Sequence, residues 1–280
     1  MLTSSATFEK PGSLDEALRF IAANTGVTVL AGGTDLLVEQ ELGTREMTTV
    51  VDIFDLPELR GIRKHGKRIW IGATTTWTDV ARSELLLEEA PSLAECARTV
   101  GALQIQNRGT VGGNLANASP AGDSLPVLLS LDAMVEAASA QRGPRFIPLD
   151  RFFLGYRRVE LQPDEIITGV WLPARAPEDL THYRKVGTRL AQAISKVVLG
   201  ARLKIADGVV TEARIAYGSV AAVPVRCETT ERALLGRPVD PRMAELVVRD
   251  ITPIDDIRST STYRKQVAVN ILRAWLESLA

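Results

Sequence analysis

A pair of glycines lies near the middle of the chain, between a polar turn and an apolar segment, in the sequence GTVGGNLANASPAGDSLP at residues 109–126. Glycine pairs allow backbone N–H groups to point together at an anion, and they allow a ligand to approach the main chain closely. An apolar, helix-like run begins at Leu125. Because the intervening segment is dense in polar side chains, we expect it to be a ligand-binding loop. These side chains are Asn114, Asn117, Ser119, Asp123 and Ser124.

A second glycine pair occurs earlier, in TVLAGGTDLL at residues 28–37. The pattern predicts a strand, a Gly-Gly turn and then a helix, which is a geometry that holds phosphate on backbone amides. Gly-Gly is also ordinary turn chemistry, so either loop alone is explained equally well as a tight turn. Two such loops, each followed by an aspartate, favour a ligand with two phosphates, or with one phosphate and a sugar.

Composition excludes several classes of protein. A chain of 280 residues with 45% apolar residues is long enough for two domains with separate cores. The net charge of −1 argues against nucleic acid as a partner. Cys96 and Cys227 form no CxxC pattern, and His65 and His182 form no metal-ligand cluster. We therefore expect no disulfide framework, no iron–sulfur cluster held by this chain and no metal site.

The sequence also shows no sign of a secretion signal or of a membrane-spanning segment. The first eight residues lack a basic start followed by an apolar core, which disfavours a secretory signal peptide. The sequence contains no run of roughly 18 apolar residues, the length that a membrane-spanning helix needs. These two features predict a cytoplasmic protein with no membrane segment.

The first half of the chain reads as two lobes. In lobe 1–55, Ser13 and Glu16 form a capping box for a helix over 14–22, and strands are expected at 27–30 and 50–53. In lobe 56–175, a hairpin over 59–72 is followed by helices and by strands near 134–138, 145–148 and 165–172. The second lobe should therefore be an antiparallel α+β unit.

A Pro-rich, charged linker, PARAPED at 173–179, predicts a domain boundary, giving domains 1–175 and 176–280. Beyond it, strands at 195–205 and 209–217 are joined by Asp207-Gly208, a strong hairpin signal. Helices are expected at 228–235, 241–251 and 260–279. The C-terminal domain should be a small antiparallel sheet with helices, so that the fold class is α+β.

Common catalytic and nucleotide-binding motifs are absent. The sequence has no GxGxxG after a strand, no GxxxxGK[ST] and no GxSxG, which disfavours a Rossmann fold, a P-loop nucleotidase and a serine hydrolase. What remains is a large, phosphate-containing ligand held by two glycine loops between two α/β lobes.

AGGTDLL at 31–37, together with the stretch at 109–126, closely resembles the flavin-binding subunit of the molybdenum hydroxylases, the family of xanthine and carbon monoxide dehydrogenases. The similarity runs nearly end to end and includes the tail DIRSTSTYRKQVAVNIL at 256–272. It implies a p-cresol-methylhydroxylase-type FAD-binding domain of two α/β lobes, followed by a C-terminal domain. The first loop is most similar to that of bacterial xanthine dehydrogenase flavin subunits.

The resemblance also implies which residues bind FAD. The first loop would contact the pyrophosphate through backbone N–H groups, and the second would close on it from the other lobe. Asp123 would take a hydroxyl of the ribityl or ribose unit, although it could also cap the next helix. Ile167 and Lys185 would lie at the adenine side or the flavin ring, with a solvated strand lysine as the alternative for Lys185. The loop residues implied are Leu30, Ala31, Gly32, Gly33, Thr34, Asp35, Thr110, Gly112, Gly113 and Asn114.

The implied function is electron transfer, with the chemistry belonging to the flavin and no catalytic residue on this chain. Substrate, expected to be a purine or another aromatic heterocycle, would be oxidised at a molybdenum centre on a second chain. Electrons would pass through [2Fe–2S] clusters on a third chain to this FAD, and then to NAD or another acceptor. Gln192 stands where many relatives carry aspartate, which leaves the flavin potential and the acceptor open.

Two other functions remain open at this point. A self-sufficient FAD-dependent oxidoreductase would show oxidase activity in the isolated chain. A non-enzymatic partner module that has lost its flavin would be colourless and would not take up FAD. The intact glycines of both loops argue against the second of these.

Overall fold

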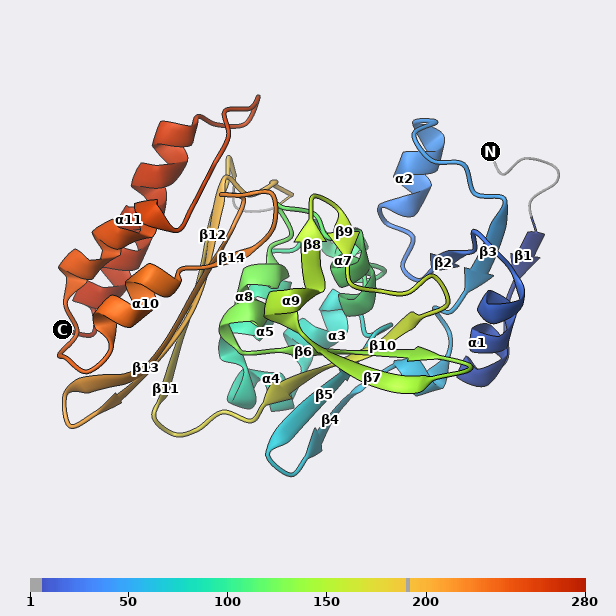
Figure 1. The fold of residues 1–280 in the computed structure, drawn as a ribbon, viewed down its shortest axis with the longest axis horizontal. Coiled ribbons are helices and arrows are strands. Elements are labelled where there is room, and N and C mark those ends of the chain that lie inside the picture. Colours follow the sequence, from blue (N-terminus) through green and yellow to red (C-terminus); the bar gives the residue numbers. More distant parts are fainter. Residues whose placement is uncertain (1–6, 190–191) are drawn as a thin grey trace.

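The structure is a computed structural model that describes residues 7–189 and 192–280. Three larger sheets follow one another along the chain, each with helices of its own, and they lie side by side in the order of the sequence (Figure 1). This mixed α/β arrangement with antiparallel sheets confirms the predicted fold class. No helix in the described part of the chain is long and apolar enough to cross a membrane.

The N-terminal lobe has a parallel sheet in the order β1 (Thr7–Glu9), β3 (Thr49–Asp52), β2 (Thr28–Leu30). Helix α1 (Leu14–Ala23) begins where the Ser13 side chain accepts a hydrogen bond from the Glu16 N–H, at 3.2 Å, which is one half of the predicted capping box. The Glu16 carboxylate accepts from the Gly12 N–H, at 2.7 Å, rather than from Ser13. Helix α2 (Leu36–Glu41) follows the first glycine loop. Parallel strands need crossover connections, which α1 and α2 provide. The sequence predicted these elements except for β1.

The second lobe is built on a five-stranded antiparallel sheet whose two long-range pairings were not predictable from local sequence. β10 (Ile166–Pro173) lies between β5 (Arg68–Gly72) and β6 (Met134–Ser139), although it comes last in the sequence. The outer strands are β4 (Ile62–His65) and β7 (Gly143–Pro148). The predicted antiparallel α+β lobe is therefore confirmed.

Helices cover one face of this sheet, where Ile69, Ile71 and Val170 join a large apolar core. The helices are short because proline, serine and threonine restart them repeatedly; Thr76 and Asp79, for example, form a capping box. The remaining elements of the lobe are η1 (Pro57–Leu59), α3 (Trp77–Arg82), α4 (Glu84–Glu89), α5 (Pro91–Ala97), α6 (Leu103–Gln106), α7 (Val111–Asn117), α8 (Ser124–Ser130), α9 (Leu149–Phe152), β8 (Phe153–Gly155) and β9 (Arg158–Val159).

The C-terminal part is a four-stranded antiparallel sheet, ordered β11 (Asp179–Val186), β12 (Val197–Ala206), β13 (Val209–Gly218), β14 (Val225–Arg226). Asp207 and Gly208 both have positive φ, 51° and 74°, which confirms the predicted hairpin turn. Helices α10 (Glu228–Leu234) and α11 (Ser261–Glu277) pack on this sheet. Residues 241–249 form a 3₁₀ helix, η2, where the pattern predicted an ordinary helix.

The opposite face of the C-terminal sheet packs on α8 of the second lobe. A Cβ at Gly200 would lie 2.6 Å from the Pro126 carbonyl oxygen, so β12 approaches α8 backbone to backbone. A polar cluster fastens the same junction, because the Asp132 carboxylate accepts from Arg202 at 2.6 Å, Arg214 at 3.0 Å and Arg226 at 3.3 Å. The two halves are therefore joined by tight packing and by convergent charge.

The Asp132→Ala variant should lower the free energy of unfolding by about 3 kcal/mol. It removes the carboxylate that three arginines share, although Arg202 keeps Glu212 and Arg226 keeps Glu231, and it places alanine in the left-handed region at φ 52°. Asp132→Asn, which tolerates that backbone and keeps one acceptor, should cost clearly less. Urea unfolding measures both, and a loss within experimental error for Asp132→Ala would show that the arginines are held without it.

A second contact ties β11 to α11 and should respond to pH. The His182 ring stacks on Trp275, with centroids 5.2 Å apart and planes 8° from parallel. Burial, together with the nearby Arg184, lowers the pKa of His182 below its usual value. The fold therefore favours the neutral ring, whereas the unfolded chain takes up a proton near pH 6.5.

Stability from this site should be complete above about pH 6.5 and should decline as the pH falls below that value. We expect the free energy of unfolding to decrease between about pH 7.5 and pH 5.5, and the His182→Gln variant to lose this part of the dependence. His65→Gln removes the other histidine and serves as the matched control. Equal pH profiles for His182→Gln and the parent chain would contradict the assignment.

Candidate functional site

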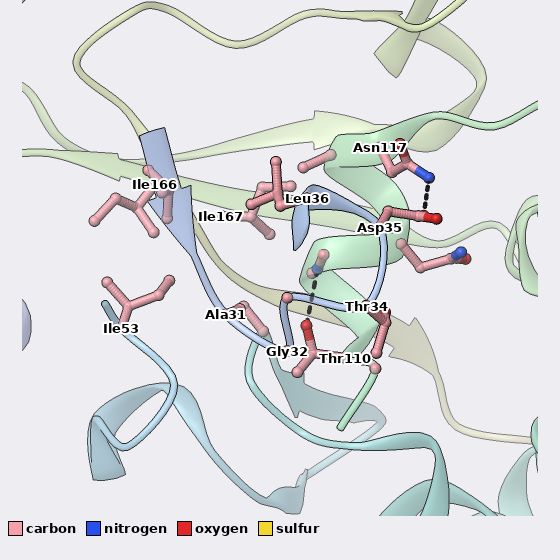
Figure 2. A pocket seen from close by; sticks show the side chains of 18 of the residues that line it. Ala31, Gly32, Thr34, Asp35, Leu36, Ile53, Thr110, Asn117, Ile166 and Ile167 are labelled. Carbon is pink, nitrogen blue, oxygen red and sulfur yellow. Dashed lines mark hydrogen bonds between the residues drawn. The ribbon is translucent and has the colours of Figure 1, made fainter. Parts of the chain in front are cut away.

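A cavity of about 490 Å³ lies where the two lobes meet, and both glycine loops line it. Figure 2 shows Ile53, Ile166 and Ile167 on one side of the cavity and the pair Asp35 and Asn117 on the other. The apolar side comes from β10 and from the segment after β3, so it is contributed by both lobes. The cavity thus combines a wall suited to a flat apolar ring with a polar wall.

The first loop presents unused backbone donors to this cavity. Within the described residues, the N–H groups of residues 32–35 have no hydrogen-bond acceptor, and all four residues line the cavity. Residues 32–34 are half-buried and Asp35 is exposed, and Asp35 directly precedes α2, where the first N–H groups of a helix have no partner within it, so these donors remain open to a ligand. Such a row of donors fits an anionic ligand, and a pyrophosphate in particular.

Gly32 is required by packing between the lobes. A Cβ at this position would lie 2.0 Å from the carbonyl oxygen of Arg108, which belongs to the second lobe. Gly33 has a φ of 73°, a conformation that glycine adopts without strain. The two glycines therefore serve different purposes: the first allows the lobes to touch and the second allows the loop to turn.

The second glycine pair lies in a helix, whereas the sequence predicted a loop. Gly112 and Gly113 lie in the first turn of α7, and Thr110 caps that helix by accepting from the Gly113 N–H at 3.1 Å. The Gly112 N–H donates to Ala73 O at 2.8 Å, and the Asn114 N–H donates to Thr110 O at 3.0 Å. These amides are already used inside the protein, which leaves side chains as the second loop's donors.

Two polar side chains of α7 lie at the cavity wall. The Asn114 side-chain oxygen accepts from Ser124 at 2.6 Å, while its Nδ2 has no acceptor among the described residues. Asn117 donates to the Asp35 carboxylate and thereby links α7 to the first loop (Figure 2). This cross-lobe bond orients Asp35, whose side chain could not be placed from sequence alone.

A second cavity, of about 800 Å³, adjoins the first and reaches the C-terminal domain. Asp35, Asn114 and Asn117 line both cavities. Its other walls include Gln192 and the segment 254–264, which we call the strap. Two joined cavities with the free amides beside their junction can accommodate a long ligand with its phosphates in the middle.

The strap is held in a fixed turn beside this second cavity. The Asp256 carboxylate accepts from the Arg258 N–H at 2.8 Å, from the Ser259 N–H at 3.0 Å and from Arg264 at 2.6 Å. The hydrogen bond from Arg264 holds the pKa of Asp256 below its usual value. Arg264 also donates to Ser219 O at 3.2 Å, which fastens the strap to the end of β13.

Asp123 and Lys185 form a buried ion pair at the second cavity, with 2.6 Å between Nζ and Oδ2. Lys185 also donates to Thr99 O at 2.9 Å, so it is not a solvated strand lysine. The other oxygen of Asp123, Oδ1, is buried without a partner. Burial raises the pKa of Asp123, and Lys185 partly opposes that effect. The carboxylate does not cap α8, which it precedes.

The structure brings most of the sequence-predicted residues together. The first cavity is lined by Ala31, Gly32, Gly33, Thr34, Asp35, Thr110, Gly112, Gly113, Asn114 and Ile167. Asp123 lines the second cavity, and Lys185 reaches it only through Asp123. Leu30 lines neither cavity; it lies at the end of β2, where its carbonyl accepts from the Ile53 N–H at 2.9 Å.

Sequence reasoning missed several wall residues that come from distant parts of the chain. Ile53 and Ile166 carry no local signal beyond strand propensity, and Asn117 was noted only as a polar neighbour of the glycines. Arg264 lies in the long C-terminal helix, which was predicted without any role at the site. In all these cases the side chain reaches the site through tertiary packing.

The chemistry available here is binding and positioning. No group of three or more potential metal ligands occurs in the described ranges, and both cysteines are buried with raised thiol pKa values. FAD fits the residues that are present, because the free amides suit its pyrophosphate and the unpaired Asp123 oxygen suits a hydroxyl. The three isoleucines provide a wall for one of its rings.

The Gly32→Ala variant should reduce the free energy of unfolding by about 2–3 kcal/mol, because a methyl group cannot share space with a backbone oxygen. Gly155→Ala is the matched control, since nothing lies within 4 Å of its Cβ and its φ is not positive. It should change stability by less than about 0.5 kcal/mol. Thermal and urea unfolding measure both variants, and similar losses would argue against the inter-lobe contact.

Comparison with known proteins agrees with this geometry. Residues 4–175 match the model of the FAD binding domain in molybdopterin dehydrogenase, and residues 181–279 match that of the CO dehydrogenase flavoprotein C-terminal domain. The xanthine dehydrogenase FAD-binding subunit of Escherichia coli O157:H7 is 31% identical over 266 residues, covering 92% of this chain and 90% of the relative. The glyceraldehyde dehydrogenase medium chain of Sulfolobus acidocaldarius is 30% identical, with 93% of each chain covered.

Among solved structures, carbon monoxide dehydrogenase from Hydrogenophaga pseudoflava superposes with a TM-score of 0.94 at 28% identity, covering 100% of this chain and 98% of that one. The family models and the end-to-end similarity together show that this chain belongs to the FAD-binding subunits of the molybdenum hydroxylase family of oxidoreductases.

Proposed function

We propose that this chain carries electrons from [2Fe–2S] clusters on a partner subunit, through its FAD, to NAD or another acceptor. The observation that carries the proposal is the row of free amides at 32–35, which lies beside the junction of two adjoining cavities. When bound, the flavin accepts electrons and passes them on; the residues of the chain bind it, orient it and shield it from water.

The first loop would hold the pyrophosphate on its N–H groups, with Thr110 and Asn114 adding side-chain donors from the opposite lobe. Asp123 Oδ1 would accept from a hydroxyl of the ribityl or ribose unit, which would satisfy its unpaired atom. Ile167 would pack on one ring. Gln192 lines the second cavity, where its amide would face a ring or an acceptor.

The lack of cysteine ligands for an iron–sulfur cluster in this sequence supports the existence of partner subunits. Cys96 and Cys227 are both buried and far apart in sequence, and an iron–sulfur cluster needs four ligands. The relatives are named as FAD subunits or medium chains, which implies assembly with other chains. We therefore propose partners that carry the iron–sulfur clusters and the molybdenum cofactor.

The substrate of the complex would be bound by another chain. Consistent with this, the identity is 31% to the xanthine dehydrogenase subunit and 30% to subunits of glyceraldehyde and caffeine dehydrogenases. Such even similarity is expected if the chain binds the shared cofactor and touches none of these substrates. A purine remains our proposal for the substrate, because the first loop is most like the xanthine dehydrogenase type.

We also propose the division into domains 1–175 and 176–280. The linker leads from β10 of the second sheet to β11 of the third, and no strand is shared between those sheets. The buried junction with α8 and Asp132 supports two domains that move little relative to each other. A site that spans both domains needs such rigidity.

The proposal is tested by the visible spectrum of the purified chain, with the released chromophore identified by chromatography. We expect one FAD per chain without iron or molybdenum, and reduction of that flavin by a reduced iron–sulfur partner followed by reoxidation with NAD. A folded, colourless chain that takes up no added FAD would instead support the non-enzymatic alternative. Rapid substrate oxidation by the isolated chain would support a self-sufficient oxidoreductase.

The Lys185→Met variant should weaken FAD binding by at least about tenfold, or about 1.4 kcal/mol, because Asp123 loses the cation that favours its ionised form. Lys204→Met removes a half-buried lysine on β12 that lines neither cavity, and it should bind FAD as the parent does. Titration of apoprotein with FAD, followed by flavin fluorescence, gives both affinities. Unchanged affinity in Lys185→Met would exclude the ion pair from the site.

A further inference from the structure

The five-stranded sheet has a second face. At one end α1 covers it, where Ala138 and Ile166 join the core of the N-terminal lobe. The rest of this face is turned away from the helices and contributes to neither cavity. Strand pairing places Arg63, Trp70, Trp171, Met134 and Pro148 in one row across all five strands. Side chains alternate along each strand, so residues two positions away share this face. We call it the outer face, and its members are Arg63, His65, Arg68, Trp70, Met134, Glu136, Phe146, Pro148, Trp171 and Pro173.

The centre of the outer face is aromatic and fixed in position. Trp70 and Trp171 are paired across strands, and both indole N–H groups donate to Glu136 Oε2, at 3.1 Å and 2.7 Å. Phe146 packs edge-on to Trp171, with centroids 6.4 Å apart, yet remains 51% exposed. None of these residues belongs to the apolar cores. A rigid, partly exposed aromatic group is typical of protein–protein hot spots.

One side of the outer face is basic. The hairpin between β4 and β5 reads RKHGKR at 63–68, with no acid, although the whole chain has a net charge of −1. Lys64 lies on the other side of the strand and pairs with Glu89, which leaves Arg63, Lys67 and Arg68 as the cations of this side. The Arg63 guanidinium lies 4.9 Å from the centre of the Trp70 ring, and the His65 ring lies 5.4 Å from Trp171. The one carboxylate on this face, Glu136, is already engaged by the indoles. A chain that docks here should therefore be acidic opposite the hairpin.

The edges of the sheet are protected against strand addition, whereas the face is not. β7 contains Pro144 and Pro148, and β4 carries consecutive cations, both of which discourage a further strand. None of the outer-face residues lines either cavity. Docking on this face would leave the FAD site and its approach free.

Charge, together with size, distinguishes between occupants. Five strands at about 4.8 Å spacing and about 17 Å of strand length give roughly 400 Å², about half of the area that each partner buries in a stable dimer. A two-fold pair of this chain would set the face against itself, so each basic hairpin would meet a surface whose one carboxylate is already engaged. We propose that the outer face docks a different protein chain, apolar at its centre and acidic opposite the β4–β5 hairpin, which also contacts neighbouring surface. This inference rests on the multi-chain complex proposed above.

Substitutions on the face should release a partner without disturbing the flavin. Phe146→Asp and Arg68→Glu change exposed side chains, so the fold should persist. In the complex purified through a tag on this chain, each should increase the dissociation constant for one partner chain at least about tenfold. Leu87→Asp on α4 and Arg232→Glu on α10 are the matched controls, since the first also replaces an exposed apolar side chain by aspartate and the second also reverses an exposed arginine charge, both away from this face.

The chemistry of the partner is tested by carbodiimide, which joins a lysine ammonium to a carboxylate in contact with it. In the purified complex, Lys67 at the hairpin turn should be linked to an aspartate or glutamate of a different chain, and Lys67→Arg should abolish the link. A link between two copies of this chain, full assembly of both face variants, or a chain that purifies as a monomer would overturn the proposal. FAD content reports the cofactor function separately, because loss of docking should leave it at the parent value.

Discussion

The contact between Gly32 and the carbonyl of Arg108 brings the two lobes close enough to form the site. Because no side chain intervenes, the first glycine loop lies directly on the segment that leads into α7. The Arg108 guanidinium lies 3.9 Å from the centre of the Phe54 ring and so fastens the same segment to the first lobe a second time. The cavity, its polar wall and the orientation of the free amides all depend on this approach.

The two glycine loops contribute to ligand binding in different ways. In the second, every amide from 111 to 114 is satisfied by Thr75, Ala73 or Thr110, which fixes α7 against the sheet. In the first, four amides are left without acceptors at the cavity. The second loop, whose amides are all hydrogen-bonded, supplies rigidity, and the first, whose amides are free, supplies affinity. The donors are therefore already oriented before a ligand arrives. Preorganisation of this kind reduces the entropy lost on binding.

Local patterns predicted the elements well, because caps and turns act over a few residues. The Ser13 cap of α1 and the Asp207-Gly208 hairpin are examples in which the local residues alone determine the outcome. The position of β10 between β5 and β6, the convergence of arginines on Asp132, and the strap beside the second cavity depend on distant packing. The resemblance to the flavin subunits identified the loop residues, but it did not indicate that the amides of α7 are already occupied.

The buried pair of Asp123 and Lys185 is best explained by function. Moving two charges out of water costs several kcal/mol for each ion, and apolar replacements of similar size often stabilise a protein. Here one carboxylate oxygen pairs with Lys185, while the other lies at the second cavity without a partner. Asp179 also keeps a buried oxygen without a hydrogen-bond partner, but it lines neither cavity, so it is the position of Asp123 at the second cavity that points to a ligand. The presence of the pair is accounted for if a ligand hydroxyl completes the set, with Lys185 favouring the ionised acceptor and Thr99 O holding the lysine in place.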